Sequence, residues 1–416
     1  VKGTDKEVWF LQDPVEDNPE HGWEEYADKY KKTLTAALFW PDVDHYEVCP
    51  WPNRVFKGRY PRKVGLAEGM IPTEDMEGAK NIPDTYATFL AGMIQTLGDM
   101  TKEESETEKD AVGVFLADSC MYQRTYPDQV EHHGQKINLS GMEDWMNHFI
   151  FQKEEDRQLL MSMEKMEYAY KECCAFPDWF GLTLPLLKYG LPIQPVYFDH
   201  MVRYDEYLKK YRYLILSYEF MKPESEEFHH KLVEWVKQGG TLFYIGKDFD
   251  PYNYLQEWWQ KFSCDTPAQH LFAEFGMDKE PANGCYRIGE GNVLVWNEVP
   301  ALLSVNEAIA DKYRNWIQEG LKMGGYHWNM CNYLSVRRDP YIVIASMQES
   351  DTGSVYTKEG LFVDLYEDKY PVVERVLVEP GQEKLLFDLE KIKDDVRIIA
   401  TAARIENMAC ENGQLS

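Results

Sequence analysis

One stretch near the middle of the chain limits the possible folds most. The apolar runs 196–198 and 213–218 predict two buried strands. Between 223 and 237 apolar residues recur at helical spacing, and the pair Gly239-Gly240 is a typical helix end. Another buried strand follows at once, at 241–245. Strands joined in this way by helices are typical of the parallel sheet of a doubly wound α/β domain.

Length and charge narrow the class of protein further. A chain of 416 residues is too long for one core and favours two or three domains. Its 14% aromatic content is typical of a folded chain. The formal net charge of -27 repels phosphate backbones and anionic lipid, so nucleic-acid and membrane partners are not expected. No apolar run reaches the roughly 18 residues that span a bilayer. We therefore expect a soluble chain.

The cysteines and histidines predict neither a disulfide scaffold nor a metal site. The eight cysteines are scattered without CxxC spacing, which favours reduced thiols in a cytoplasmic protein. The pairs His132-His133 and His229-His230 are interpreted as surface histidines, because adjacent side chains point apart and no further ligand recurs at metal-binding spacing. No cofactor is expected.

Three regions separate along the sequence. Residues 1–105 read as two consecutive βα units, with a helix expected from about 23 to 39 and another from 83 to 100. Residues 106–328 contain the doubly wound domain. Residues 329–416 lose helical periodicity, and their short strands separated by turn residues predict a small antiparallel β-sandwich.

Candidate catalytic residues lie where the first two strands end. Asp13 follows the strand 8–11, and Glu47 lies on the strand that ends in Pro50-Trp51-Pro52. Paired carboxylates beside aromatic rings are what glycoside hydrolysis needs, because one protonates the leaving oxygen and the other attacks or activates water. The alternative stays open, since such residues are more often caps or ion-pair partners. Further residues expected to line a sugar site are Trp9, Glu16, Trp51 and Arg54.

The second region lacks a recognisable nucleophile. Active class I glutamine amidotransferases share the doubly wound design and place a cysteine at a tight, Gly-flanked turn between strand and helix. Cys120 precedes Met121-Tyr122, and Cys173-Cys174 lie in a segment rich in Tyr and Glu. We therefore expect no amidotransferase activity.

Taken in order, the three regions resemble the C-terminal two-thirds of the β-galactosidase type of glycoside hydrolase that carries a trimerisation domain. The resemblance depends on residues 213–245, on Arg337-Arg338-Asp339-Pro340-Tyr341, and on 362–365 with Pro371-Val372. It implies the end of a TIM (β/α)8 barrel, then an amidotransferase-like (flavodoxin-like) domain without an active site, then a small C-terminal antiparallel β-sandwich. Val8 to Asp13 would be strand seven of the barrel, and His45 to Pro52 strand eight.

The resemblance also implies an activity and partners. The family's nucleophile is a Glu at the end of strand seven, where this chain has Asp13 with Glu16 three residues on. Its acid/base lies on strand four, which would precede Val1, and about 100 residues cannot form a barrel of roughly 250. The chain is then either a fragment or completed by a companion chain. A homo-oligomer, a trimer through the doubly wound domain, is expected.

We therefore predict retaining hydrolysis of a β-linked sugar by two carboxylates. Asp13 is the first choice for nucleophile or stabiliser, and Glu47 for the second carboxylate. As nucleophile, Asp13 should face an open space rather than a salt-bridge partner; if an Arg holds it, Glu47 or Glu16 takes its place. The alternative function is a non-catalytic assembly or carbohydrate-binding module.

Overall fold

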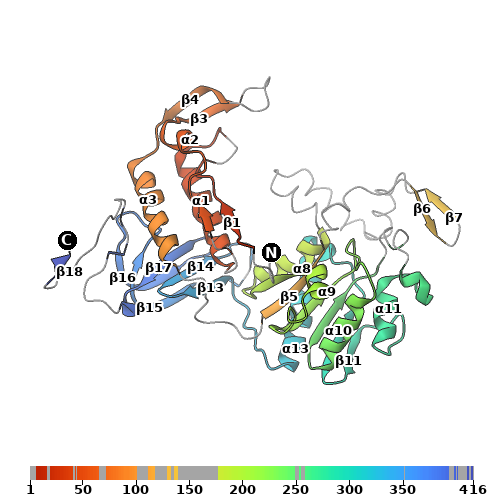
Figure 1. The fold of residues 1–416 in the computed structure, drawn as a ribbon. Coiled ribbons are helices and arrows are strands. Elements are labelled where there is room, and N and C mark those ends of the chain that lie inside the picture. Colours follow the sequence, from red (N-terminus) through yellow and green to blue (C-terminus); the bar gives the residue numbers. More distant parts are fainter. Residues whose placement is uncertain are drawn as a thin grey trace. The chain divides into compact units, whose positions relative to one another are not determined.

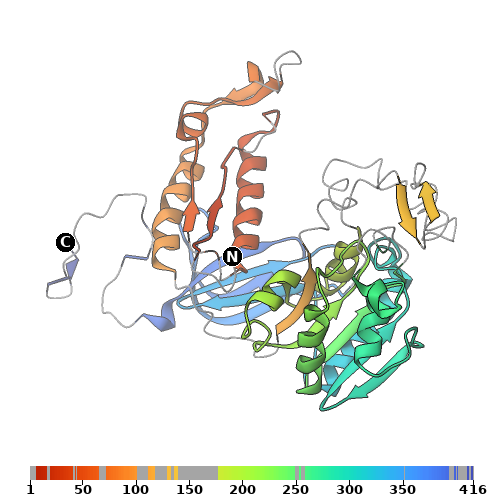
Figure 2. The same cartoon turned by 45° about the vertical axis from the view of Figure 1, so that its right-hand side comes forward.

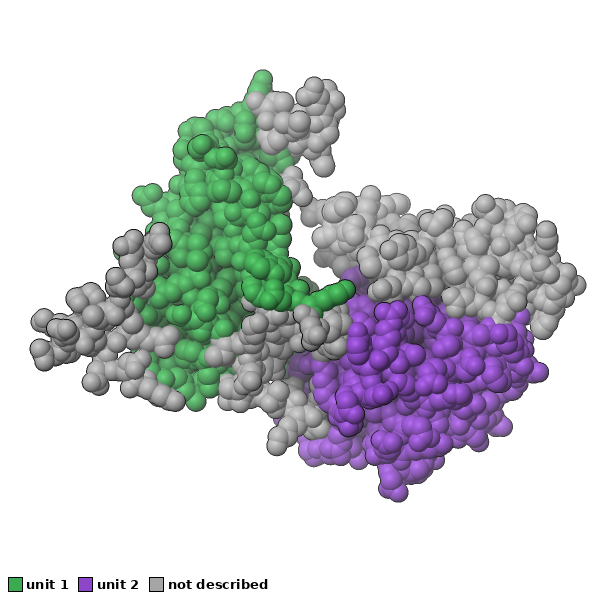
Figure 3. Space-filling view, viewed as in Figure 1, with its two compact units in different colours: residues 1–107, 331–416 green, residues 108–330 purple. Residues whose placement is uncertain are grey.

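The structure is a computed structural model in which the chain divides into two compact units, 1–107 with 331–416, and 108–330 (Figures 1 and 3). Each unit is described by itself. The sequence predicted three regions, and the first and third of them fall in one unit. The structure describes residues 6–15, 19–40, 43, 45–64, 72–100, 111–117, 129–132, 135–138, 177–248, 253, 258–350, 352–392, 398–399, 401, 410–411 and 414–415.

A six-stranded sheet forms the centre of the second unit. All of its neighbouring strands are parallel except the edge strand β11, which pairs antiparallel with β12. Counted along the chain, the parallel strands stand in the spatial order two-one-three-four-five, which is the flavodoxin-like order. The predicted parallel sheet is therefore confirmed. From edge to edge the strands are β11 (Gly284–Ile288), β12 (Gly291–Trp296), β10 (Thr241–Ile245), β9 (Tyr211–Leu216), β5 (Ala111–Leu116) and β8 (Ile193–Tyr197).

Helices cover both faces of this sheet, because its central strands are apolar on both sides. All five residues of β10 are buried. Two separate apolar clusters result, one on each face. One cluster includes residues of α9 (Phe198–Arg203), α10 (Glu227–Lys237) and α11 (Pro267–Glu274), and the other includes residues of α8 (Pro177–Leu187), α12 (Leu302–Val305) and α13 (Glu307–Met323). The unit also contains β6 (Gln129–His132), β7 (Gln135–Asn138) and the short helix η2 (Trp259–Phe262).

The first unit opens with the two predicted βα units. Strands β1 and β2 pair in parallel, and α1 lies between them in the sequence. One face of α1 is buried, and it carries Tyr26, Tyr30, Leu34, Ala37 and Leu38. The elements are β1 (Trp9–Leu11), α1 (Trp23–Leu38), β2 (His45–Glu47), α2 (Pro52–Phe56), the antiparallel pair β3 (Tyr60–Val64) and β4 (Pro72–Lys80), and α3 (Asp84–Asp99).

In its described residues the C-terminal segment forms an antiparallel sheet of five strands and a separate pair, β18 with β19, rather than the predicted sandwich of two packed sheets. Helices α1 and α3 stand on this sheet in both views (Figures 1 and 2), and their aromatic side chains share one apolar cluster with Tyr341, Val343 and Phe387. The role expected of a second sheet is thus taken by helices from the other end of the chain. The strands, in spatial order, are β13 (Tyr333–Arg338), β14 (Tyr341–Ser346), β17 (Glu383–Asp388), β15 (Tyr356–Asp364) and β16 (Val372–Val378), followed by η3 (Leu389–Lys391), β18 (Cys410–Glu411) and β19 (Gln414–Leu415).

Hydrogen bonds join the two ends of the first unit. The Oγ1 of Thr35 on α1 lies 2.9 Å from the buried hydroxyl of Tyr366, and Lys31 Nζ donates to the Tyr366 carbonyl over 2.7 Å. Burial raises the pKa of the Tyr366 phenol, so this hydroxyl stays neutral. None of the helices in the described residues of the chain is both long and apolar enough to cross a membrane.

Candidate functional site

The candidate site lies at the carboxyl ends of β1 and β2. Trp9, Phe10 and Leu11 pair in register with His45, Tyr46 and Glu47, and the Gln12 amide extends the ladder by donating to the Glu47 carbonyl over 3.1 Å. Because both strands run the same way, the residues that follow them reach one edge. That edge carries Asp13 after β1 and Trp51 after β2.

The two faces of this strand pair differ. Gln12 is buried and its Nε2 donates to the Tyr30 carbonyl of α1 over 2.8 Å, so one face of β1 is turned to the helices. Alternation places Trp9, Leu11 and Glu47 on the opposite face. There the Trp9 and His45 rings stack with centroids 4.5 Å apart. Trp9 is 64% exposed and Leu11 49%, so this face is apolar and open.

Two contacts hold the Asp13 carboxylate at the edge, and a third holds the residue after it. Its Oδ1 accepts the Val15 amide over 3.1 Å, which is the local turn that an Asp before a Pro favours. Its Oδ2 lies 3.1 Å from a guanidinium nitrogen of Arg54. The Pro14 carbonyl accepts the Tyr86 hydroxyl of α3 over 3.1 Å. The expectation that Asp13 has no salt-bridge partner is therefore wrong, because the short helix α2 brings Arg54 to it.

Arg54 connects several parts of the edge. A second guanidinium nitrogen donates to the Val15 carbonyl over 2.8 Å, and the guanidinium carbon lies 5.6 Å from the centre of the Trp51 ring. Trp51 itself is 47% exposed. Asp13, Arg54 and Trp51 are thus brought together by the structure, as a carboxylate, a cation and an exposed aromatic ring.

The structure describes Glu47 but not Glu16. Glu47 is exposed at the end of β2, on the face that carries Trp9 and Leu11. Glu16 lies outside the residues that the structure describes. Glu47 and Glu16 were the expected nucleophiles if Asp13 proved to be ion-paired. Of these two residues, the structure describes Glu47.

Two neighbouring groups are neutral. Burial, and then the Asp13 charge, raise the pKa of the Cys49 thiol. Burial also raises the pKa of the Tyr30 phenol, with smaller contributions from Tyr366, Cys49 and Asp13. Neither group is therefore a thiolate or phenolate nucleophile near neutral pH. Chemistry at this edge would have to come from the carboxylates of Asp13 and Glu47.

A metal site is not indicated in the described residues. Within the described residues no group of three or more His, Cys, Asp or Glu side chains is arranged to hold a metal ion. Of the paired histidines, His132-His133 lie outside the described side chains. His229 was interpreted as a surface residue, and this is wrong, because it is fully buried and its Nδ1 lies 2.8 Å from Nδ1 of His270.

Comparison with known proteins gives weak structural matches. No family model matches the chain, and no curated protein matches it in sequence. Among solved structures, a catalytic mutant of Gan42B, a GH42 β-galactosidase from G. stearothermophilus, matches with a TM-score of 0.34 and 11% identity over 67% of this chain. The β-galactosidase from Bacillus circulans sp. alkalophilus matches with a TM-score of 0.35 and 9% identity over 72% of this chain.

The matched proteins are much longer than the matched region. This chain covers 40% and 43% of those two β-galactosidases, and 26% of an exo-carrageenase GH42 from Bacteroides ovatus, which matches with a TM-score of 0.25 and 12% identity. The two β-galactosidases carry the name of the family that the sequence resembles. Matches at this level assign neither an activity nor a substrate to this chain.

The sequence did not single out three residues that shape the edge. Gln12 and Tyr30 fix β1 to α1, and His45 stacks on Trp9. The sequence signal that could have found them is the alternation of side chains along a strand. Once the strand register is known, this alternation places Gln12 and His45 on opposite faces.

In the second unit, the carboxyl ends of β9 and β10 are tied by a buried carboxylate. Glu219 Oε1 accepts the amides of Lys247 and Asp248 over 2.7 and 2.8 Å. Cys264 and Cys285, the cysteines of this unit whose surroundings the structure describes, lie near η2 and on β11. Neither occupies a strand-to-helix turn of the amidotransferase kind; Cys120 and Cys173-Cys174 lie outside the described residues.

Proposed function

We propose that this chain is part of a retaining glycoside hydrolase that acts on a β-linked sugar, with its active site at the carboxyl ends of β1 and β2. The observation that carries the proposal is the meeting of Asp13, Arg54 and the exposed Trp51 at that edge, beyond the last strand pair, Leu11 and Glu47. Two carboxylates and an aromatic face are the chemical parts that hydrolysis of a glycosidic bond uses.

The roles follow from the surroundings of each group. Glu47 is exposed on the face opposite the helices, so its carboxylate is open to a substrate, and we assign it the nucleophilic attack on the anomeric carbon. Asp13 is held by Arg54 and by the Val15 amide, so its position is fixed; we assign it the stabilisation of the positive charge that develops on the sugar ring. Trp51 would stack on a sugar ring, and Arg54 would orient Asp13.

The open strand pair requires a partner. A parallel pair of three residues each is too small to be stable alone, and Trp9 and Leu11 leave an apolar face uncovered. We propose that further parallel strands, from the same polypeptide or from a companion chain, complete a (β/α)8 barrel and supply the acid/base carboxylate. Trimer formation through the second unit belongs to the same proposal.

Trapping the covalent intermediate tests the assignment. In the complete enzyme, a 2-fluoro glycosyl fluoride should form a slowly hydrolysed adduct, because the fluorine destabilises the transition state that releases the sugar. Peptide mass spectrometry should locate this adduct on Glu47. Glu47→Gln should lower kcat/KM by several orders of magnitude, whereas the matched control Glu77→Gln, on exposed β4, should leave it unchanged. An adduct on Asp13 would exchange the two roles, and one on neither residue would refute the site.

A second function is favoured by one observation. The Asp13–Arg54 ion pair is also what a structural carboxylate makes, and this agrees with a non-catalytic assembly or carbohydrate-binding module. Such a module would bind a β-galacto-oligosaccharide through Trp51 without turnover. Trp51→Ala would then abolish binding, while Glu47→Gln would leave binding intact and no variant would change any hydrolysis.

A further inference from the structure

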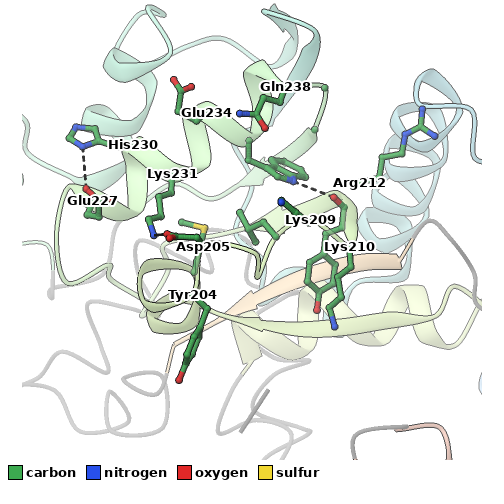
Figure 4. Close-up of a pocket in the computed structure, with 16 residues that line it drawn as sticks. Tyr204, Asp205, Lys209, Lys210, Arg212, Glu227, His230, Lys231, Glu234 and Gln238 are labelled. Carbon is green, nitrogen blue, oxygen red and sulfur yellow. Dashed lines mark hydrogen bonds and ion pairs between the residues drawn. The ribbon is translucent and has the colours of Figure 1, made fainter. Parts of the chain in front are cut away.

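A groove of about 810 Å³ crosses the surface of the second unit, between the outer side of α10 and the segment 204–212, which ends in the first residues of β9. Figure 4 shows Glu234 and Gln238 projecting from α10, and Lys231 reaching Asp205 on the opposite wall. The charged atoms of this last pair lie 2.8 Å apart. The volume lies within the range of pockets that hold small organic ligands. The proposed active site belongs to the first unit, so this groove is a separate feature.

The charged side chains of the groove nearly balance one another. Asp205 forms an ion pair with Lys231, and Glu227 lies 3.8 Å from a ring nitrogen of His230. A charged ligand of either sign would meet like charges along the groove, so the lining favours a neutral ligand. The carboxylates of the lining are those of Asp205, Glu227 and Glu234, and its cations are Lys209, Lys210, Arg212 and Lys231.

Trp235 provides a flat apolar surface in the groove. Its indole N–H donates to the Tyr211 carbonyl over 3.2 Å, which fixes the ring. A Cβ added to Gly240 would stand 2.5, 2.5 and 2.6 Å from Cδ2, Cε3 and Cε2 of this ring. Because these distances are nearly equal, one face of the ring lies against the Gly240 backbone. The other face is turned away from that backbone, and the side chain is partly exposed where it lines the groove.

The lining favours a saccharide over a peptide. A peptide bound as an added strand needs an open sheet edge, but β9 is paired on both sides, by β10 and by β5. A peptide helix needs exposed aliphatic anchor sites, but Met201 and Leu208 of the groove are buried. A sugar ring offers an apolar face and hydroxyl groups around its edge. These suit the flat ring of Trp235 and the planar polar groups of Glu234 and Gln238.

We propose that this groove binds a neutral oligosaccharide, with one sugar ring stacked on the exposed face of Trp235 and neighbouring hydroxyls hydrogen-bonded to Glu234 and Gln238. The choice of a β-linked sugar rests on the proposed function. The groove deepens that function, because a second binding site on the same chain holds a long polysaccharide near the protein while the first unit cleaves it.

Calorimetry tests this inference on the full chain carrying Trp51→Ala, which removes the aromatic ring of the proposed active site. The probes are a β-galactan hexasaccharide, a β-glucan hexasaccharide, a hexagalacturonate and hexaproline. At least one of the two neutral saccharides should bind, and its affinity should change by less than about twofold as salt rises, because salt screens only charged ligands. Adding Trp235→Ala should weaken this binding roughly tenfold or more. Adding Gln238→Ala, at an exposed position, should weaken it about threefold to tenfold.

Phe262→Ala is the matched control, because this ring of the same unit is 47% exposed and does not line the groove. It should leave binding unchanged, and thermal melts check that each variant is folded; if Trp235→Ala is not, Gln238→Ala decides. The inference is overturned if neither neutral saccharide binds, if Phe262→Ala weakens binding as much as the groove variants do, or if hexaproline or hexagalacturonate binds as tightly. Binding here without a trapped adduct on Glu47 or Asp13 would refute the proposed active site and leave this inference intact.

Discussion

Acid should weaken the second unit through two buried histidines. His229 of α10 is fully buried and His270 of α11 is 2% exposed. Their Nδ1 atoms lie 2.8 Å apart, and Nε2 of His229 lies 2.7 Å from the Tyr218 hydroxyl that follows β9. At this distance one Nδ1 donates a hydrogen and the other accepts it, so the pair requires at least one neutral ring. Adding a second proton would break the contact between α10 and α11.

The sign and size of the effect follow from linkage. Burial lowers the pKa of His229 well below its ordinary value of 6.5, and His270 and His230 add to this. Burial also lowers the pKa of His270. The unfolded chain therefore takes up protons first, so stability is complete above pH 6.5 and is lost as the pH falls below it. Between pH 7.5 and 5.5, His229 alone should reduce the free energy of unfolding by about 1 to 2 kcal/mol.

Denaturant unfolding of the chain at pH 7.5, 6.5 and 5.5 measures this loss. His270→Gln keeps a hydrogen-bonding side chain beside His229 but removes one titrating ring, so the loss on acidification should shrink. His327→Gln is the matched control, because this exposed ring of the same unit is not among the charges that shift the pKa of His229 or His270. The groups around the pair that titrate or carry charge are Tyr218, Glu226, His230, Glu274 and Lys279. Equal stability at pH 7.5 and 5.5, or an unchanged loss in His270→Gln, would refute the reasoning.

Three further predictions concern packing. Gly320→Ala should destabilise the chain by roughly 1 to 3 kcal/mol, because the new Cβ would stand 2.3 Å from the Phe243 ring. Gly98→Ala should stabilise α3 by up to about 1 kcal/mol, because its Cβ meets no atom within 4 Å. Thermal melts of the two variants should therefore shift in opposite directions. Residues 108–330 expressed alone should melt cooperatively in calorimetry, because both faces of their sheet are covered within the unit. Residues 1–107 alone should not, because α1 and α3 would expose the cluster that the C-terminal sheet covers; a sharp melt of this fragment would contradict the assigned core.

The sequence was most informative for the second unit. Strands β9 and β10 and the crossover helix α10 could be read directly, because each is a continuous apolar run or a helical repeat bounded by Gly or polar residues. The strand expected at 196–198 is shifted, since β8 covers Ile193–Tyr197 and Phe198 begins α9. Local pattern also determined α1, whose buried face is spaced as a helix requires. These features depend on residues that are neighbours in the chain.

Contacts between distant segments could only come from the tertiary structure. Whether the strands of the C-terminal segment face a second sheet or the helices α1 and α3 is not encoded in their alternation, since either cover buries the same apolar side chains. The partner of Asp13 was undecided for the same reason: an Asp before a Pro predicts a turn, but Arg54, 41 positions later, reaches it only because β1 and β2 pair in parallel and α2 follows. Local periodicity fixes which face of an element is apolar, whereas the free energy of burying that face determines which distant segment covers it.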